Sequence, residues 1–260
     1  MTKRTGNIDS RRITVDGIPA WNEVPALLVP GNMQAYGIYE DFLEEQNLAG
    51  ADPIGRSPRG WHARMSNADW AMADVAGGVC MITTDGGDND YGQITLGGEL
   101  SGAFFPAANT EIWFETRIRQ TIAGINTLNL AFGLIDPTND EYLRDNGAGI
   151  LAAIENYIIF QTLDTGGGNN AWSFVGEKAT AADTNALTID LVSLEWHTYG
   201  FYVHGVDNIY VYYDREYQED GLIATANIPI TGLMPFVAIK DGGDVEYVQI
   251  DYIMCIQTRV

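Results

Sequence analysis

The chain has 260 residues, 46% of them hydrophobic, and it carries 35 acidic against 14 basic side chains. All-β domains of about 200–250 residues are common as single units, so one domain with a sizeable core is expected. The formal net charge of −21 argues against nucleic acid and anionic membranes as partners, because phosphate contacts require a basic surface. We also expect no membrane span and no secretory signal, because no long apolar run is present and none follows the basic start.

The first 35 residues differ from the rest of the chain. Residues 1–12 carry a net charge of +3, whereas the remaining residues carry −24. Prolines at positions 19, 25 and 30 argue against a helix and predict an extended arm. Two interpretations of this arm stay open: a solvated tail, as at most termini, or an anchor that docks on another subunit. The residues proposed for an anchor are basic or apolar, namely Lys3, Arg4, Arg11, Arg12, Ile13, Val15, Trp21, Leu27 and Leu28.

Short β-branched and aromatic runs, separated by Gly, Asp and Asn, follow the arm to the end of the chain. This pattern predicts strands at Tyr36–Leu43, Ala68–Val75, Gly78–Thr84, Tyr91–Leu96, Glu111–Gln120, Thr127–Ile135, Gly149–Ile154, Tyr157–Leu163, Trp172–Val175, Ala186–Val192, Trp196–His204, Ile209–Tyr217, Leu222–Ile228, Met234–Ile239 and Glu246–Gln257. The best helix candidate is the short run Glu40–Asn47. We therefore predict an all-β, two-layer antiparallel sandwich, a jelly roll over residues 36–260, behind an N-terminal arm of residues 1–35.

The terminal strand Glu246–Gln257 is expected to be central and buried, with Tyr252 or Ile253 facing the core, because alternate residues share a face. Cys80 and Cys255 lie in strand-like runs and are expected to be buried free thiols, with a single disulfide as the alternative.

Three segments resemble strands of the concanavalin A-like lectin/glucanase superfamily: Phe114–Ile118, Leu130–Leu134 and Val248–Ile253. Three others are similar to laminin-G-like structural proteins of tailed-bacteriophage particles: Tyr39–Phe42, Gly78–Asp85 and Asp88–Ile94. The resemblance implies a concanavalin A-like jelly roll. In its narrower form it implies a non-enzymatic virion protein, a decoration or cement protein on the capsid surface. Such a protein would assemble in the host cytoplasm, form homo-oligomers and bind the major capsid protein or other virion proteins.

The alternative function is a carbohydrate-binding, lectin-like module of a tail or cell-surface protein, with a glycan as partner. Six tryptophans and 13 tyrosines supply aromatic surface for sugars, but sandwiches also bury aromatic rings in their cores. The sequence leaves open which of these side chains face solvent.

Catalysis of the glucanase type is not expected. These enzymes need two nearby carboxylates, which the β-glucanases of the superfamily supply from an E-x-D-x-E strand. Glu111 and Glu115 match its two ends, but their strand comes too early in the chain order. Both are predicted to lie on a solvated strand face beside arginines. His197 and His204, seven positions apart on one strand, face opposite sides, and we expect a backbone carbonyl to cap each half-buried ring.

Calcium is the one metal that the sequence leaves open, and no other cofactor is predicted. Asp85, Asp88 and Asp90 offer the hard oxygen ligands that Ca²⁺ accepts, although acidic Gly-rich loops are more often plain turns. The superfamily resemblance adds Asp251, which corresponds to a terminal-strand Asp that helps to hold a structural calcium in the glucanases.

Overall fold

The structure, a computed structural model, describes residues 12–15, 18–21, 35–42, 54–56, 60–73, 78–97, 102–121, 128–137, 141–144, 148–163, 172–189 and 194–259. For residues 12–15, 18–21, 54–56, 73, 224 and 225 only the backbone is described. The strands are β1 (Arg12–Val15), β2 (Ile18–Trp21), β3 (Ala35–Glu40), β4 (Ile54–Arg56), β5 (Trp61–Ser66), β6 (Ala68–Ala73), β7 (Val79–Thr84), β8 (Tyr91–Leu96), β9 (Glu111–Gln120), β10 (Asn129–Ile135), β11 (Asn156–Thr162), β12 (Ser173–Lys178), β13 (Ala181–Ala186), β14 (His197–His204), β15 (Asn208–Tyr213), β16 (Glu216–Ala224), β17 (Met234–Lys240) and β18 (Tyr247–Thr258).

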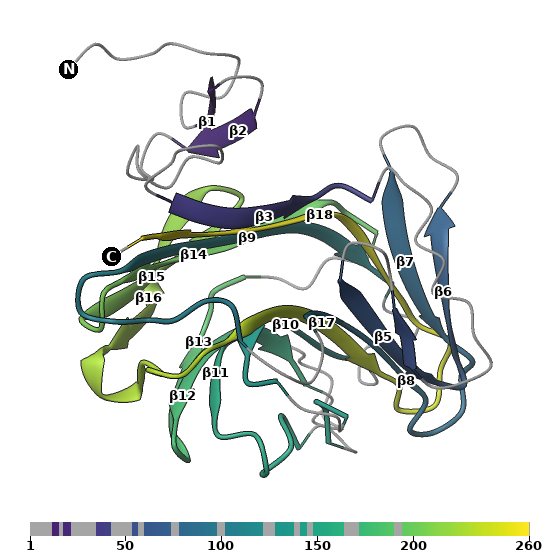
Figure 1. Cartoon of the computed structure of the whole chain (residues 1–260). Helices are drawn as coiled ribbons and strands as arrows, with labels where there is room; N and C mark the ends of the chain where they lie inside the picture. The colour runs from purple at the N-terminus through teal and green to yellow at the C-terminus, as the bar shows by residue number, and fades with distance from the viewer. Residues whose placement is uncertain are drawn as a thin grey trace.

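Two antiparallel sheets pack face to face, which confirms the predicted sandwich (Figure 1). The sheet drawn uppermost in Figure 1, termed the upper sheet, has the order β16-β15-β14-β9-β18-β7-β6, with β3 also paired to β18. The lower sheet has the order β13-β12-β11-β10-β17-β8-β5-β4. Within the described residues the one helical turn is a 3-10 turn at Thr225–Asn227, and no described helix is long and apolar enough to cross a membrane.

The main core lies between the two sheets and follows the period-two pattern of the strands. In β9 the alternate residues Ile112 and Phe114 point inward and are fully buried. The centre of the core is aromatic: the Phe132 ring lies 5.4 Å from the rings of Phe160 and Trp172 and 5.1 Å from that of Tyr199. Burial of apolar and aromatic area between the sheets is the main source of stability in such a fold.

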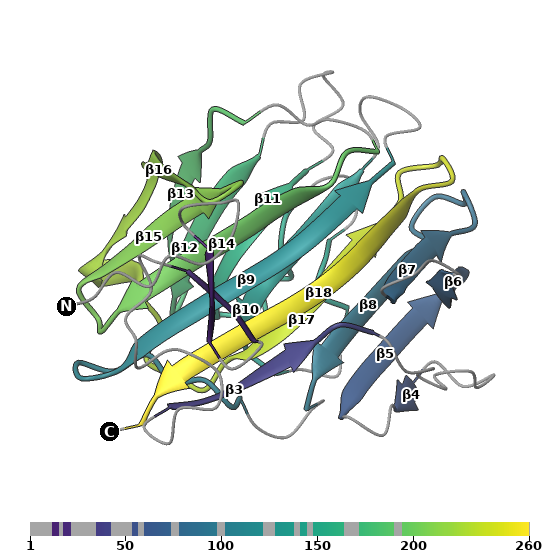
Figure 2. The same ribbon diagram turned by 90° about the horizontal axis from the view of Figure 1, so that it is seen from above.

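β18 runs through the middle of the upper sheet, as predicted (Figure 2). It pairs with β9 along one side, and on the other side with β7 near its start and with β3 near its end. Ile253 is fully buried in the main core, which confirms the predicted facing of this strand.

A second apolar cluster covers the outward face of the lower sheet. Ile150 and Ile154 are buried there against outward-facing residues of β10, β11 and β17, and the ring of Tyr142 lies 5.0 Å from that of Phe236. The predicted strand Gly149–Ile154 is therefore wrong: apart from the isolated bridge between Leu143 and Ile150, this run has no strand pairing. Its apolar residues are buried against the sheet without joining it.

Other strand boundaries also differ from the prediction. β4 and β5 were not predicted, because Trp61–Ser66 mixes basic and apolar residues and lacks β-branched ones. The run predicted at Ala186–Val192 begins where β13 ends, and residues 187–189 are not in a strand. A turn at Asp214 and Arg215 divides the run predicted at Ile209–Tyr217. The predicted strand Leu222–Ile228 overlaps the end of β16, and the 3-10 turn follows at Thr225.

The predicted helix at Glu40–Asn47 is not formed in its described part. Glu40 is the last residue of β3, and residues 41–42 are not helical. Glu40 accepts hydrogen bonds from the Phe42 amide at 3.0 Å and from the Trp61 indole at 3.3 Å, so it ties the end of β3 to the lower sheet. The remaining residues of that run lie outside the described residues.

Both cysteines are fully buried free thiols, as expected. Cys80 lies opposite Ile250 on β18, five residues from Cys255. This is roughly 16 Å along a strand, whereas a disulfide needs Cα atoms within about 7 Å. Burial raises the pKa of both thiols well above its ordinary value. The thiolate is therefore disfavoured in the folded state, and stability falls as pH rises beyond the ordinary thiol pKa.

We predict that neither thiol reacts with an aromatic disulfide reagent at pH 8 in the native protein, and that both react after denaturation. The reagent attacks through the thiolate, which burial suppresses at both sites. Spectrophotometric thiol counting with and without guanidinium checks this result. Rapid labelling of one thiol in the native state would contradict the burial of both side chains.

Candidate functional site

Five aromatic side chains form a continuous patch on the outward face of the upper sheet, termed the tyrosine face: Trp113, Tyr202, Tyr210, Tyr212 and Tyr217. Strand register brings them together, because Tyr202 lies opposite both Trp113 and Tyr210, and Tyr212 lies opposite Tyr217. Neighbouring ring centroids are 5.3 Å apart for Trp113 and Tyr212, 5.9 Å for Tyr212 and Tyr217, and 6.1 Å for Tyr202 and Tyr210. Gly200 makes room for this packing, since a Cβ there would lie 3.3 Å from the Trp113 ring.

The patch runs from a buried end to an exposed end. Trp113 is 1% exposed, whereas Tyr217 is 46% exposed. The face was not predicted, although the run Ile209-Tyr210-Val211-Tyr212 carries a signal for it: aliphatic and tyrosine residues alternate, which places the tyrosines opposite the core. Exposed rings of this kind offer flat apolar surface with polar hydroxyl tips.

Polar and charged groups border the tyrosine face. The His204 ring nitrogen Nδ1 lies 3.2 Å from the Tyr202 hydroxyl and 3.9 Å from a carboxylate oxygen of Glu111. Burial raises the pKa of the Tyr202 phenol, and the hydrogen bond and negative charge of Glu111 raise it further. The phenol therefore stays protonated and keeps a hydrogen to donate. Aromatic rings beside hydroxyl, imidazole and carboxylate groups are the surface that a ligand with both apolar faces and hydroxyl groups requires.

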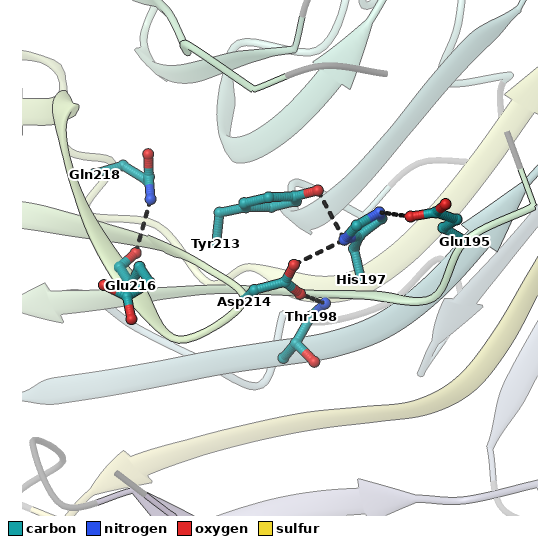
Figure 3. Close-up of polar contacts among 7 residues, drawn as sticks. All are labelled: Glu195, His197, Thr198, Tyr213, Asp214, Glu216 and Gln218. Atoms are coloured by element: carbon teal, nitrogen blue, oxygen red, sulfur yellow. Dashed lines mark hydrogen bonds and ion pairs between the residues drawn. The ribbon is translucent and has the colours of Figure 1, made fainter. Parts of the chain in front are cut away.

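A second polar cluster surrounds His197 at the start of β14 (Figure 3). Its Nδ1 atom lies 2.8 Å from Asp214 Oδ2 and 2.7 Å from the Tyr213 hydroxyl, and its ring stacks on that of Tyr213 at 5.0 Å. The other carboxylate oxygen of Asp214 accepts the Thr198 amide at 2.8 Å. Among the described residues, Nε2 makes no hydrogen bond, and a Glu195 oxygen lies 3.9 Å away.

The His197 cluster stabilises the turn between β15 and β16. Asp214 and Arg215 both have positive φ, as the two central residues of a tight hairpin turn require. The expected carbonyl cap on His197 is wrong, because a carboxylate and a phenol contact Nδ1 instead. The contacts of the two histidines confirm that they point to opposite sides of β14. His197 contacts Tyr213, which packs on the core, whereas His204 contacts Tyr202 on the outer face.

Glu115 is not on a solvated face. It is 2% exposed, and the Tyr252 hydroxyl donates a hydrogen bond to it. Glu111, on the same strand face, is only partly buried. The prediction of a solvated pair is therefore wrong for Glu115, because the outward face of β9 is itself covered at this point.

The four aspartates predicted as calcium ligands have other partners or lie apart. Asp251 accepts a hydrogen bond from Arg117 at 2.7 Å. Asp90 accepts the Gly87 amide at 2.7 Å and the Asn67 side-chain amide at 2.9 Å, whereas Asp85 and Asp88 are exposed. No group of three or more His, Cys, Asp or Glu side chains in the described part of the chain is arranged to hold a metal ion. A structural calcium stays a prediction.

The N-terminal arm is described only in part. Lys3, Arg4, Arg11, Leu27 and Leu28 lie outside the described residues, and for Arg12, Ile13, Val15 and Trp21 only the backbone is given. That backbone forms a two-stranded antiparallel sheet of β1 and β2, separate from both large sheets. The hairpin was not predicted, although Asp-Gly at positions 16 and 17 is a strong hairpin signal. The anchor role and the division at residue 35 stay predictions.

Comparison with solved structures establishes the class of fold. The exoplasmic/lumenal domain of VIP36, in a form bound to Ca²⁺ and Man3GlcNAc, matches with a TM-score of 0.55 and 11% identity, over 77% of this chain and 84% of that chain. Peanut lectin matches with a TM-score of 0.55 and 10% identity, over 87% and 98%. The metal-free carbohydrate recognition domain of Emp46p matches with a TM-score of 0.54 and 11% identity, over 81% and 94%.

The protein therefore has the lectin-type, concanavalin A-like jelly-roll fold. At such identities the likeness defines the fold alone. Of these neighbours one is a lectin, one is a carbohydrate recognition domain and one carries a bound glycan, and Emp46p has also been solved with bound potassium. No protein-family model matches the sequence, and no curated protein is significantly similar to it.

Proposed function

We propose that this protein is a lectin-like carbohydrate-binding module, and that the exposed end of the tyrosine face contacts the sugar. The observation that carries the proposal is the row of outward-facing rings from Tyr202 to Tyr217, bordered by His204 and Glu111. Sugar rings have apolar C–H faces that stack on such aromatic surfaces, and their hydroxyl groups pair with the bordering polar side chains. The lectin-type fold supports the same function by analogy.

Binding should depend on half-buried Tyr210 and exposed Tyr217. Tyr210→Ala and Tyr217→Ala are each expected to weaken glycan binding about tenfold or more, because each removes a ring on which a sugar would stack. The measurement is an array of mannose-, galactose-, glucose- and sialic acid-containing oligosaccharides. Isothermal titration calorimetry with the strongest ligand then gives the affinity of the unaltered protein and of each variant.

Tyr247→Ala is the matched control, because Tyr247 also belongs to the upper sheet but lies at the end of β18 that pairs with β7, away from the tyrosine face. It should leave the affinity unchanged. Failure of the unaltered protein to bind any glycan on the array would overturn the proposed function. Binding that survives both tyrosine substitutions would show that the sugar site lies elsewhere on the molecule.

The virion role rests on the narrower sequence resemblance and stays a separate prediction. It includes a location on the capsid surface, homo-oligomers and the major capsid protein as partner. It is compatible with a sugar-binding face, because a particle-surface protein can also bind glycans. The likeness to lectin structures has no bearing on it.

A further inference from the structure

An apolar cluster on the outward side of the upper sheet is buried although it lies outside the two-layer core. Trp113 on β9 and Tyr252, Met254 and Ile256 on β18, together with Ala35 on β3, form this outer cluster. Met254 and Ile256 are each only 2% exposed. The inward-facing residues of the same strands are buried as well, so β9 and β18 are covered on both faces at this point.

The described side chains that pack against this cluster are three tyrosines of the same sheet, Tyr39, Tyr202 and Tyr212. Tyr39 stacks on Tyr252 at 5.8 Å, and Tyr212 contacts Trp113 at 5.3 Å. Both belong to the same sheet, and side chains of one sheet face stand side by side, roughly perpendicular to it. Such neighbours border the cluster at its sides, and a layer of chain above Met254 and Ile256 would complete its removal from water.

The position of the N-terminal hairpin indicates which segment forms this layer. In Figure 1 the β1–β2 hairpin lies outside the upper sheet, and in Figure 2, seen from above, it crosses over β9 and β14. The chain then enters the upper sheet at Ala35, a member of the outer cluster, where β3 pairs with the end of β18. The segment before Ala35 therefore starts beside the surface that needs a cover.

We propose that residues 1–34 fold back on their own sandwich and cover the outer cluster as a third layer. The segment has apolar side chains suited to this surface, at Ile13, Val15, Ile18, Trp21, Val24, Leu27 and Leu28. Its basic start also favours contact with the rest of the chain, because residues 35–260 carry a net charge of −22. A tether at Ala35 gives the segment an effective concentration of the order of millimolar at the cluster. The occupant is therefore the same chain, in place of the second subunit expected for an anchor.

Thiol accessibility tests this proposal in the full-length protein. Met254→Cys places a thiol in the outer cluster, while the native thiols of Cys80 and Cys255 are buried in the core and should not react. With a protease site inserted after residue 34, the new thiol should be protected before cleavage and react at least about tenfold faster once the arm is removed. Tyr217→Cys, at the exposed end of the tyrosine face, should react rapidly in both states.

A single substitution in the arm keeps the test decisive if the cleaved protein proves unstable. Trp21→Ala in the Met254→Cys background should raise the reactivity of the new thiol at least about threefold without cleavage. Equal protection before and after cleavage, with the arm washed away, would overturn the proposal, and so would rapid labelling of the intact chain. Protection that disappears on dilution, together with a dimer seen by ultracentrifugation, would assign the cover to a second copy and contradict the own-chain arrangement. None of these outcomes depends on glycan binding.

Discussion

Replacing Phe132 with alanine is expected to destabilise the protein by about 3–5 kcal/mol, at the upper end of what a single substitution does. Phe132 is fully buried at the point where three other aromatic rings, those of Phe160, Trp172 and Tyr199, approach within 5.4 Å. Its strand, β10, is hydrogen-bonded on both sides, to β11 and β17. The surrounding rings cannot collapse far into the space left by the deleted ring, so both the transfer free energy and the packing around the cavity are lost.

The measurement is urea-induced unfolding followed by tryptophan fluorescence, with the free energy of unfolding taken from the midpoint and slope. Phe105→Ala is the matched control, because Phe105 is 48% exposed and its deletion should change the free energy by less than about 1 kcal/mol. A loss below about 1.5 kcal/mol for Phe132→Ala would contradict a tightly packed centre between the sheets.

Asp241→Ala is expected to cost about 2–4 kcal/mol of stability, an unusually large effect for a loop residue. Asp241 is 1% exposed, at the start of the link between β17 and β18. One of its carboxylate oxygens accepts the amides of Gly243 at 2.6 Å and Asp244 at 2.7 Å. The other accepts the Thr84 hydroxyl at 3.1 Å. Removing the carboxylate leaves several donors without their charged acceptor.

The same position also joins two loops. The Asp241 amide donates to the Asp90 carbonyl at 2.9 Å, and the Asn89 amide donates to the Asp241 carbonyl at 3.2 Å. Asp241 thereby ties the link between β7 and β8 to the link between β17 and β18, across the two sheets.

Two variants separate the local hydrogen bonds from a general charge effect. Asp88→Ala removes an exposed carboxylate from the neighbouring loop and should change stability by less than about 0.5 kcal/mol. Asp241→Asn keeps one acceptor oxygen and should lose less than the alanine variant does. Thermal and urea unfolding of the three variants provide the measurement. Equal effects of Asp88→Ala and Asp241→Ala would show that net charge, and not the hydrogen bonds, governs the response.

The outer surfaces of the sandwich explain why some sequence-based predictions were wrong. In a plain two-layer sandwich each strand has one buried face and one solvated face. In this protein the segment that contains Tyr142 and Ile154 covers part of the lower sheet, and the outer cluster on β9 and β18 is also buried. An alternating pattern therefore identifies the inward face of β9 correctly, yet it wrongly predicts that Glu115 on the other face is in water.

The tyrosine face shows how much of the candidate site could be predicted from the sequence. The alternation in β15 is sufficient to place Tyr210 and Tyr212 opposite the core. Their combination with Trp113 and Tyr217 depends on the pairing of β9, β14, β15 and β16, and these strands come from positions up to about a hundred residues apart. Register between distant strands is set by the packing of the whole sheet, which no local pattern contains.

The all-β class, the two-layer sandwich, the buried thiols and the central place of the last strand were all predictable from the amino-acid sequence. Each follows from short-range alternation of apolar residues and from turn residues, which act within a few positions. The partners of His197, the burial of Glu115, the buried clusters on the outer faces and the assembly of the tyrosine face became evident from the folded structure alone. These features join residues far apart in the chain, and their energies depend on which surfaces remain open to water once both sheets have formed.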